Sequence, residues 1–258
     1  MTRTMWTRAG REACVTMALM AIGAGCLMAQ AKKVSKGEAE AYNAMVTAAT
    51  SGDHDATIKA ADDLITKYAD TQFKATALWL EASAYEAKGD DDRAQVYAEQ
   101  CLAADPKGFQ APLLIGQGIV THTRENDLDK DEKLAKAEKD LNLAIENVKA
   151  AAKPNPNIPD DRWEEQKKFT IANADADIGR VYLLRKKYAD AIGPLQAAVD
   201  GDPQPAYLIW LASSQQQAGK NDEAISTVDK LLAQNPPAVF VNAANAIKKD
   251  ATRAKGGK

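Results

Sequence analysis

The two histidines, His54 and His122, are the first candidates for chemistry, because imidazole acts as a general base and as a metal ligand near neutral pH. Neither histidine has a companion at the spacing of a metal site or of a nucleophile and its base. The motifs G-x-S-x-G and H-E-x-x-H are also absent from the sequence. We therefore interpret both histidines as exposed residues without a function. We predict that the chain is not an enzyme and that it needs no cofactor and no metal.

A glycine pair, Gly116-Gln117-Gly118, lies within a predicted helix. A phosphate-binding loop needs a strand before the first glycine and a third glycine after the second, and the sequence has neither here. We therefore interpret this pair as a site where two helices pack closely.

Acidic residues in the segment 127–131, together with Glu138, have the spacing of a calcium-binding loop. Glu132, however, occupies the position at which this loop needs glycine for a sharp turn. We interpret residues 123–132 as a solvated insertion between two helices, with calcium binding as the alternative.

The N-terminus has the pattern of a targeting segment. Arg3, Arg8 and Arg11 precede an uncharged stretch, residues 13–31, that ends in Ala29-Gln30-Ala31. Its apolar core is shorter than the ~20 residues of a spanning helix. We therefore predict a signal peptide over residues 1–31 and an exported protein, periplasmic or secreted. An uncleaved segment that anchors the protein in a membrane is the alternative.

Cleavage after residue 31 would remove Cys14 and Cys26, so that Cys101 is the one cysteine left and no internal disulfide can form. Cys101 occupies a helix position where a small residue packs inward. We interpret it as a buried, inert thiol, with a redox role as the alternative.

From about Glu38 onward, apolar residues recur with helical period between short turns that contain Gly, Asp or Pro. Strand-like alternation is absent, and aromatic residues make up 6% of the chain, so we predict an all-α protein. A unit of two helices recurs along the sequence. Its clearest copy has small or apolar residues at Leu78, Ala82, Tyr85, Ala94, Ala98 and Cys101, a turn at Gly89-Asp90 and a stop at Pro106.

The same spacing returns in two further copies, and it resembles the tetratricopeptide repeat family across most of the mature chain. The resemblance implies a right-handed solenoid of antiparallel helix pairs with a capping helix at the C-terminus. The two copies have their key residues at Gly179, Tyr182, Tyr188, Ala191, Leu195, Ala198 and Pro203, and at Leu208, Ala212, Gly219, Ala224, Leu231 and Pro236.

We expect the repeat domain to cover residues 32–254, followed by a disordered tail at 255–258. Val239, Ala243, Ile247 and Ala251 are expected to cover the last repeat. The predicted units are 38–70, 74–106, 109–153, 160–203 and 205–236, and the capping helix is 238–254.

The resemblance further implies that the first helix of each repeat lines a concave groove for a protein or peptide partner. We expect Trp79 to contribute more to binding than to folding, because it lies one step away from the packed face of its helix and has no repeat neighbour there. The groove candidates are Trp79, Ser83, Glu86, Gln110, Leu113, Gln117, Asn173, Arg180, Leu183, Ile209, Ser213 and Gln216.

Charge restricts the kinds of partner. With 33 Lys and Arg against 36 Asp and Glu, the chain lacks the broad basic field that nucleic-acid binding requires. Membrane contact is expected only through an uncleaved N-terminus. The predicted function is that of an exported scaffold or adaptor that binds a protein or peptide partner in the cell envelope. A structural spacer or a non-catalytic accessory subunit of an envelope assembly complex is the alternative.

Overall fold

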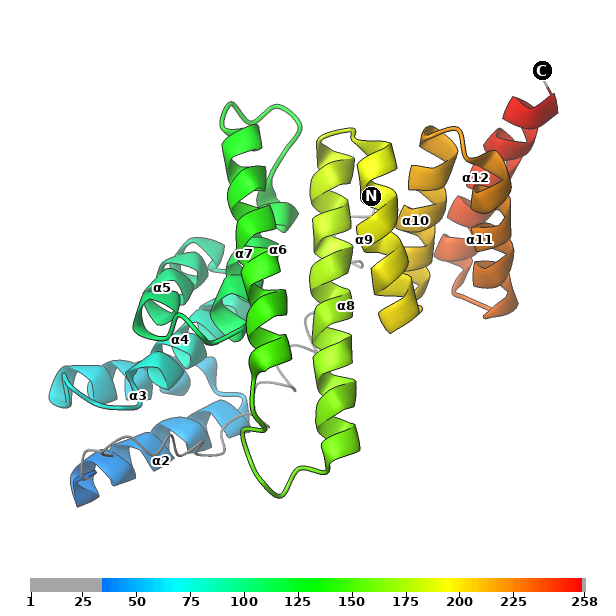
Figure 1. The fold of residues 1–258 in the computed structure, drawn as a ribbon. Coiled ribbons are helices and arrows are strands. Elements are labelled where there is room, and N and C mark those ends of the chain that lie inside the picture. The colour runs from blue at the N-terminus through cyan, green and yellow to red at the C-terminus, as the bar shows by residue number, and fades with distance from the viewer. Residues whose placement is uncertain (1–33, 257–258) are drawn as a thin grey trace. The chain divides into compact units, whose positions relative to one another are not determined.

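The structure, a computed structural model, describes residues 34–256, and within them every regular element is an α-helix (Figure 1). The all-α prediction is therefore confirmed for this part of the chain. The predicted signal segment lies outside the described residues. The helices are α2 (Lys36–Ser51), α3 (His54–Lys67), α4 (Lys74–Lys88), α5 (Asp91–Ala104), α6 (Gln110–His122), α7 (Lys130–Ala150), α8 (Asp160–Leu184), α9 (Tyr188–Gly201), α10 (Pro205–Gln217), α11 (Asn221–Ala233) and α12 (Ala238–Gly256).

Local residue chemistry explains where the N-terminal helices begin and end. Gly52 and Gly89 follow α2 and α4 with φ angles of 74° and 77°, a left-handed conformation that glycine adopts without a steric penalty. The next residues, Asp53 and Asp90, then cap α3 and α5 by accepting hydrogen bonds from backbone N–H groups of the first turn. A glycine followed by aspartate thus ends one helix and starts its antiparallel partner.

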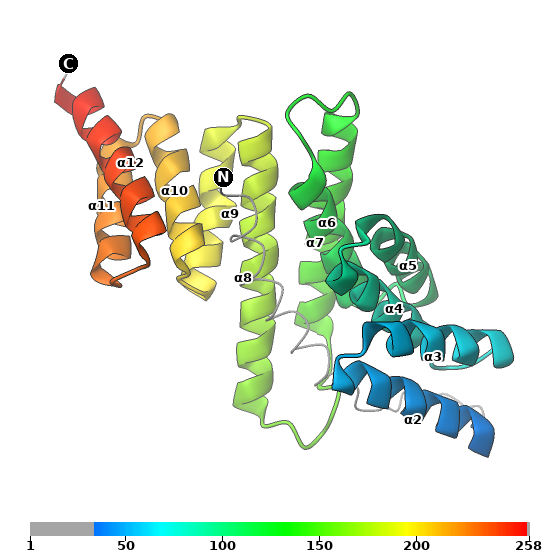
Figure 2. The same ribbon diagram turned by 180° about the vertical axis from the view of Figure 1, so that it is seen from behind.

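The described residues form two compact units, which we call unit 1 and unit 2. Unit 1 comprises residues 34–115 and 149–166, and unit 2 comprises residues 116–148 and 167–256. In unit 1, α2 packs on α3, α3 on α4 and α4 on α5. In unit 2, α9 to α12 lie side by side in chain order (Figures 1 and 2), and α12 also contacts α10. Each unit is a stack of consecutive helices, as in a solenoid.

Two glycines allow the paired helices of unit 2 to approach closely. A Cβ atom at Gly116 would lie 2.5 Å from Cγ of Leu141, and one at Gly179 would lie 2.4 Å from Cγ of Leu195. Both leucines are fully buried, so they have no space into which to move. The packing role predicted for the glycine pair in α6 is therefore confirmed for Gly116, whereas a Cβ atom at Gly118 would meet nothing within 4 Å.

The C-terminal helix covers the last repeat, with one correction. Ala243 and Ile247 pack against the apolar cluster of α10 and α11, and Ala251 is fully buried, as predicted. The prediction that Val239 covers the last repeat is wrong, because 45% of this residue is exposed. Phe240, the next residue, packs against the cluster instead. The helix rotates by about 100° per residue, so one position decides which side chain faces inward.

No helix within residues 34–256 combines the length and the apolar character that crossing a membrane requires.

We predict that Gly179→Ala lowers the free energy of unfolding by about 1–3 kcal/mol, because the added methyl group overlaps Leu195 in a closed core. Gly193→Ala is the matched control, since a Cβ atom there meets nothing within 4 Å and alanine is the better helix former. Urea unfolding followed by circular dichroism measures both variants. Equal stability of the two variants would contradict the close approach of α8 and α9.

Candidate functional site

The predicted groove residues all lie on the first helices of repeats, α4, α6, α8 and α10. Two of them, Leu113 and Ile209, are buried, with 6% and 7% exposed, so they offer almost no surface to a partner. The other ten are partly exposed. Trp79, Ser83, Glu86, Gln110 and Leu113 belong to unit 1, and the remaining seven belong to unit 2.

In unit 2 the structure brings groove residues from two helices, Gln117 of α6 and Arg180 of α8, together around one buried carboxylate. Nη1 of Arg180 donates to Oδ1 of Asp177 over 2.6 Å, and the side chain of Gln117 on α6 also hydrogen-bonds this carboxylate. The guanidinium group of Arg180 lies 5.3 Å from the ring centroid of Trp210 on α10. Asp177 therefore links α8 to α6, and Arg180 links α8 to α10.

A second connection runs between α8 and α10. The hydroxyl group of Tyr207 donates a hydrogen bond to Oδ1 of Asn173, and the Tyr207 ring stacks on Trp210 with centroids 5.8 Å apart. Two predicted residues of α8 are thus joined to one aromatic pair. We call this set, Gln117, Asn173, Asp177, Arg180, Tyr207 and Trp210, the Arg180 surface.

Asp177, Tyr207 and Trp210 were missing from the predicted groove. A signal for Asp177 exists in the sequence, because an acid three residues before Arg180 on one helix is positioned to pair with it. The contact of Arg180 with Trp210 has no such signal, since it joins helices of different repeats.

Electrostatics hold the Arg180 guanidinium in one orientation. Burial raises the pKa of Asp177 above its ordinary value, while the charge and hydrogen bond of Arg180 and the hydrogen bond of Gln117 act in the opposite direction. The Arg180 side chain remains 28% exposed, against 10% for that of Asp177. A guanidinium group has five N–H donors, so an oriented and partly exposed one can bind a carbonyl or carboxylate group of a partner.

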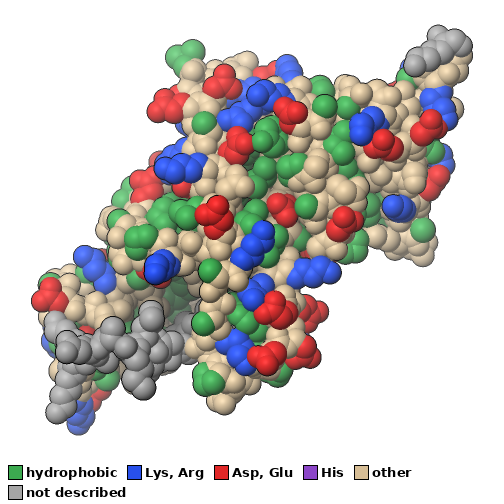
Figure 3. Space-filling model, viewed as in Figure 1, with side chains coloured by type: hydrophobic (Ala, Val, Ile, Leu, Met, Phe, Trp, Pro, Cys, Tyr) green, Lys and Arg blue, Asp and Glu red, His purple; other side chains and the backbone are tan. Residues whose placement is uncertain are grey.

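Four of the other partly exposed groove residues of unit 2 suit the same kind of contact, and the fifth, Leu183, is apolar. Gln117, Asn173, Ser213 and Gln216 carry amide or hydroxyl groups, which hydrogen-bond to a peptide backbone in either direction. Acidic and basic side chains are intermixed among the described residues on the face in Figure 3, so this face presents no field of a single charge. The chemistry of the surface is that of recognition by hydrogen bonds and an aromatic pair.

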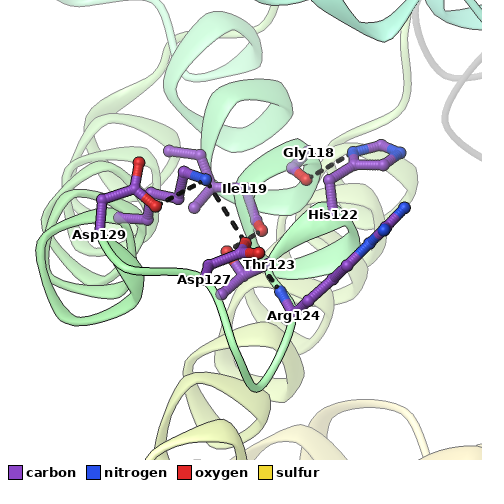
Figure 4. Close-up of polar contacts among 8 residues, drawn as sticks. Gly118, Ile119, His122, Thr123, Arg124, Asp127 and Asp129 are labelled. Carbon is purple, nitrogen blue, oxygen red and sulfur yellow. Dashed lines mark hydrogen bonds and ion pairs between the residues drawn. The ribbon is translucent and has the colours of Figure 1, made fainter.

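The insertion between α6 and α7 is held by its own acids (Figure 4). Oδ2 of Asp127 accepts hydrogen bonds from the backbone N–H of Arg124 over 3.0 Å and from Lys133 over 3.4 Å, and Asp129 pairs with Lys133 at 2.9 Å. The backbone N–H of Arg124 is the main cause that lowers the pKa of Asp127, and Lys133 adds to it. Among residues 34–256, no group of three or more His, Cys, Asp or Glu side chains could hold a metal ion.

The structure corrects two predictions, the bounds of this insertion and the exposure of one histidine. Helix α7 begins at Lys130, so the last three residues of the predicted insertion are helical. His122 is exposed, with Nδ1 2.8 Å from the carbonyl oxygen of Gly118 (Figure 4). His54, predicted to be exposed, is partly buried at the start of α3.

Cys101 is a buried thiol, as predicted. It is 6% exposed, and Sγ donates to the carbonyl oxygen of Ala75 over 3.3 Å. Burial, with a smaller contribution from the charge of Asp105, raises the pKa of the Cys101 thiol to about 12. The thiolate is the reactive form, so this cysteine is protected from oxidation and alkylation in the folded protein.

The surroundings of Trp79 differ from those that we predicted. Its side chain is partly buried and packs against two apolar clusters of unit 1, one around Met45 and Leu64 and the other around Leu78 and Cys101. The expectation that Trp79 has no repeat neighbour is therefore wrong. It fills the space where the first two repeats meet.

We predict that Trp79→Ala lowers the free energy of unfolding by about 2–3 kcal/mol, somewhat less than for a fully buried tryptophan, because both clusters lose a neighbour. Ser83→Ala on the same helix is the control and should change stability by less than about 0.5 kcal/mol. Thermal and urea unfolding provide the measurement. A stable Trp79→Ala variant would show that the packing seen around Trp79 contributes little.

Comparisons with known proteins agree with this architecture. The family described as "Tetratricopeptide repeat" matches residues 75–107, which contain the turn and cap between α4 and α5. A comparison with curated protein sequences found no match.

Solved structures share the fold at low sequence identity. One is TTC0263, a thermophilic TPR protein of Thermus thermophilus, with a TM-score of 0.50 and 19% identity over 81% of this chain and 98% of that chain. Another is MamA, residues 41 to the end, from Desulfovibrio magneticus, with a TM-score of 0.57 and 16% identity over 78% of this chain and 96% of that chain. Residues 75–107 thus match the tetratricopeptide repeat family in sequence, and the chain shares its fold of stacked helix pairs with these solved structures.

Proposed function

We propose that this protein is an exported scaffold that binds a protein or peptide partner of the cell envelope through the Arg180 surface. The observation that carries the proposal is the contact of Arg180 with Asp177 and Trp210, which holds a partly exposed guanidinium group beside amide side chains on adjacent helices. An extended peptide offers backbone carbonyl and N–H groups at regular intervals, and such a row of donors and acceptors suits it.

The energetics of the surface support binding in place of catalysis. Its polar groups are already oriented by contacts within the chain, so a partner binds without the entropic cost of ordering them. Arginine and tryptophan are also the residue types that contribute most to binding energy at protein interfaces. A proton-transfer or nucleophilic reaction needs an acid–base pair or an activated nucleophile, and the carboxylate of the Arg180 surface is paired with arginine.

Mature protein, residues 32–258, used as bait in an envelope extract should retain a stoichiometric partner. Arg180→Ala should lower the affinity for that partner by ~5–30-fold, because it removes the oriented donor from the Arg180 surface. Lys230→Ala, which removes one exposed positive charge from the second helix of the last repeat, is the matched control. Affinities measured on the purified pair decide the result. Equal affinity of the two variants would contradict the proposed surface, and a spacer would retain no partner at all.

Export is the second part of the proposal and is supported by the arginines before the apolar stretch and by Ala29-Gln30-Ala31. We predict that the exported protein begins at Lys32. N-terminal sequencing of protein isolated from the envelope fraction provides the test. An N-terminus at Met1 in a membrane fraction would instead support the uncleaved anchor.

A further inference from the structure

Unit 1 contains a carboxyl group with no hydrogen-bond partner in its core. Glu81, on α4, is 0% exposed, and neither of its carboxyl oxygens has a hydrogen-bond partner. An ionised carboxylate in such a position lacks both water and a counterion, which makes it costly to the fold.

The repeats of this chain show that an acid is not needed at this position. Glu81 directly precedes Ala82, the small residue of the first helix, and the residues that precede Gly116, Gly179 and Ala212 in three other repeats are all buried aliphatics. They are Ile115, Ile178 and Leu211. A residue that breaks the packing rule of its own repeats, at a cost to stability, marks a functional position.

The groups around Glu81 are acidic and aromatic. From α3, the exposed carboxyl group of Asp62 approaches it closely enough to share a hydrogen bond when one of the two carries a proton. Burial first, and then Asp62, raise the pKa of Glu81 to about 8. From α5, Tyr97 lies beside both acids, and its own pKa is raised to about 12 by burial and then by their charges.

The aromatic side of this cluster is already suited to a cation. The Tyr97 ring stacks on Tyr85 of α4 with centroids 5.3 Å apart, and the guanidinium group of Arg93 lies 5.1 Å from the Tyr85 centroid. Arg93 is paired with Asp90 at 3.0 Å, whereas every influence on the pKa of Glu81 raises it. The two acids therefore lie beside an aromatic pair, and no cation of the described chain lowers the pKa of the buried one.

We propose that Asp62 and Glu81 bind a basic side chain of the partner protein, foremost an arginine, with Tyr97 beside it. This inference rests on the proposed function and names the chemistry of a second contact with the partner. A guanidinium group fits because its planar fork matches carboxylates and its face stacks on aromatic rings. A calcium ion fits poorly, because it requires six to eight oxygen ligands and two carboxylates supply at most four.

Binding exchanges one proton for one cation. The entering guanidinium group first meets Asp62, which is exposed, and Glu81 then releases its proton to the solvent and becomes the second carboxylate. Below the pKa of Glu81, this release makes the affinity rise by up to ~10-fold per pH unit, and above it the affinity levels off.

The test uses mature full-length protein and the peptide acetyl-(Gly-Arg)4-amide, followed by calorimetry and by NMR of the carboxyl carbons. We expect tighter binding at pH 8.5 than at pH 6.5 by ~10-fold or more, with shifts at Asp62 and Glu81. A peptide with citrulline in place of arginine is the matched control, because it keeps the shape and removes the charge. Equal affinity for the two peptides, or shifts confined to other acids, would overturn the proposal.

Three variants separate this site from general surface charge. The glutamine of Glu81→Gln cannot ionise, so this variant should remove the pH dependence of binding. Asp62→Asn should lower the affinity for the arginine peptide at both pH values. Asp63→Asn, an exposed acid on the same helix that pairs with Lys59, should have no effect. If Asp63→Asn weakens binding as much as Asp62→Asn, the peptide binds only through diffuse charge and the proposal fails. If the arginine peptide fails to bind while Arg180 still controls capture of the partner, this inference fails and the proposed function stands.

A stability measurement tests the cost of the acid independently of the peptide. The unfolded state loses the Glu81 proton near its ordinary pKa of 4.5, whereas the folded state keeps it to about 8, so the folded state binds more protons in this window. Stability from this group therefore falls as the pH rises from 4.5 to 8. Glu81→Leu introduces the type of residue that three other repeats have at this position. It should raise the melting temperature, and by more at pH 8 than at pH 5. A lower melting temperature at both pH values would show that Glu81 supports the core and would overturn the proposal.

Discussion

The distance at which the two helices of a repeat can approach is the constraint on which the rest of this protein depends. In unit 2, Gly116 faces Leu141 and Gly179 faces Leu195, and a single methyl group at either glycine would overlap a buried leucine. Each leucine fills the space that the missing side chain leaves, which allows two helix axes to approach without a void. The faces that the first helices present to their neighbours follow from this contact.

Close stacking in unit 2 has a consequence for its polar residues. Because the first helices lie near one another, side chains beside the packed face meet across repeats, as Arg180 of α8 meets Trp210 of α10. Such contacts orient polar groups before any partner arrives. A surface that is ordered by the fold itself loses little entropy on binding, which is the physical advantage of a repeat scaffold.

Two of the buried acids among residues 34–256, Asp177 and Glu81, have opposite surroundings. Asp177 is satisfied within its own unit by Arg180 and Gln117, so its burial helps to fix the Arg180 surface. Glu81 faces another acid and a tyrosine, and its burial together with Asp62 raises its pKa to about 8. The first acid is paired within the chain, whereas the second has no hydrogen-bond partner, and an unpaired buried carboxylate is costly to a fold when it is ionised.

The sequence by itself determined the helices, the turns between them and the buried small residues. These features depend on contacts within one repeat: the glycine that ends α4, the aspartate that caps α5, and Cys101 at a fixed spacing from them. Only the tertiary structure decided which side chains of different helices meet. It packed Trp79 against two apolar clusters, buried Leu113 and Ile209, and joined Arg180 to Trp210. The physical reason is that helical period fixes the direction of a side chain from its own axis, whereas its neighbours depend on how successive helices stack, and that is a long-range property of the folded chain.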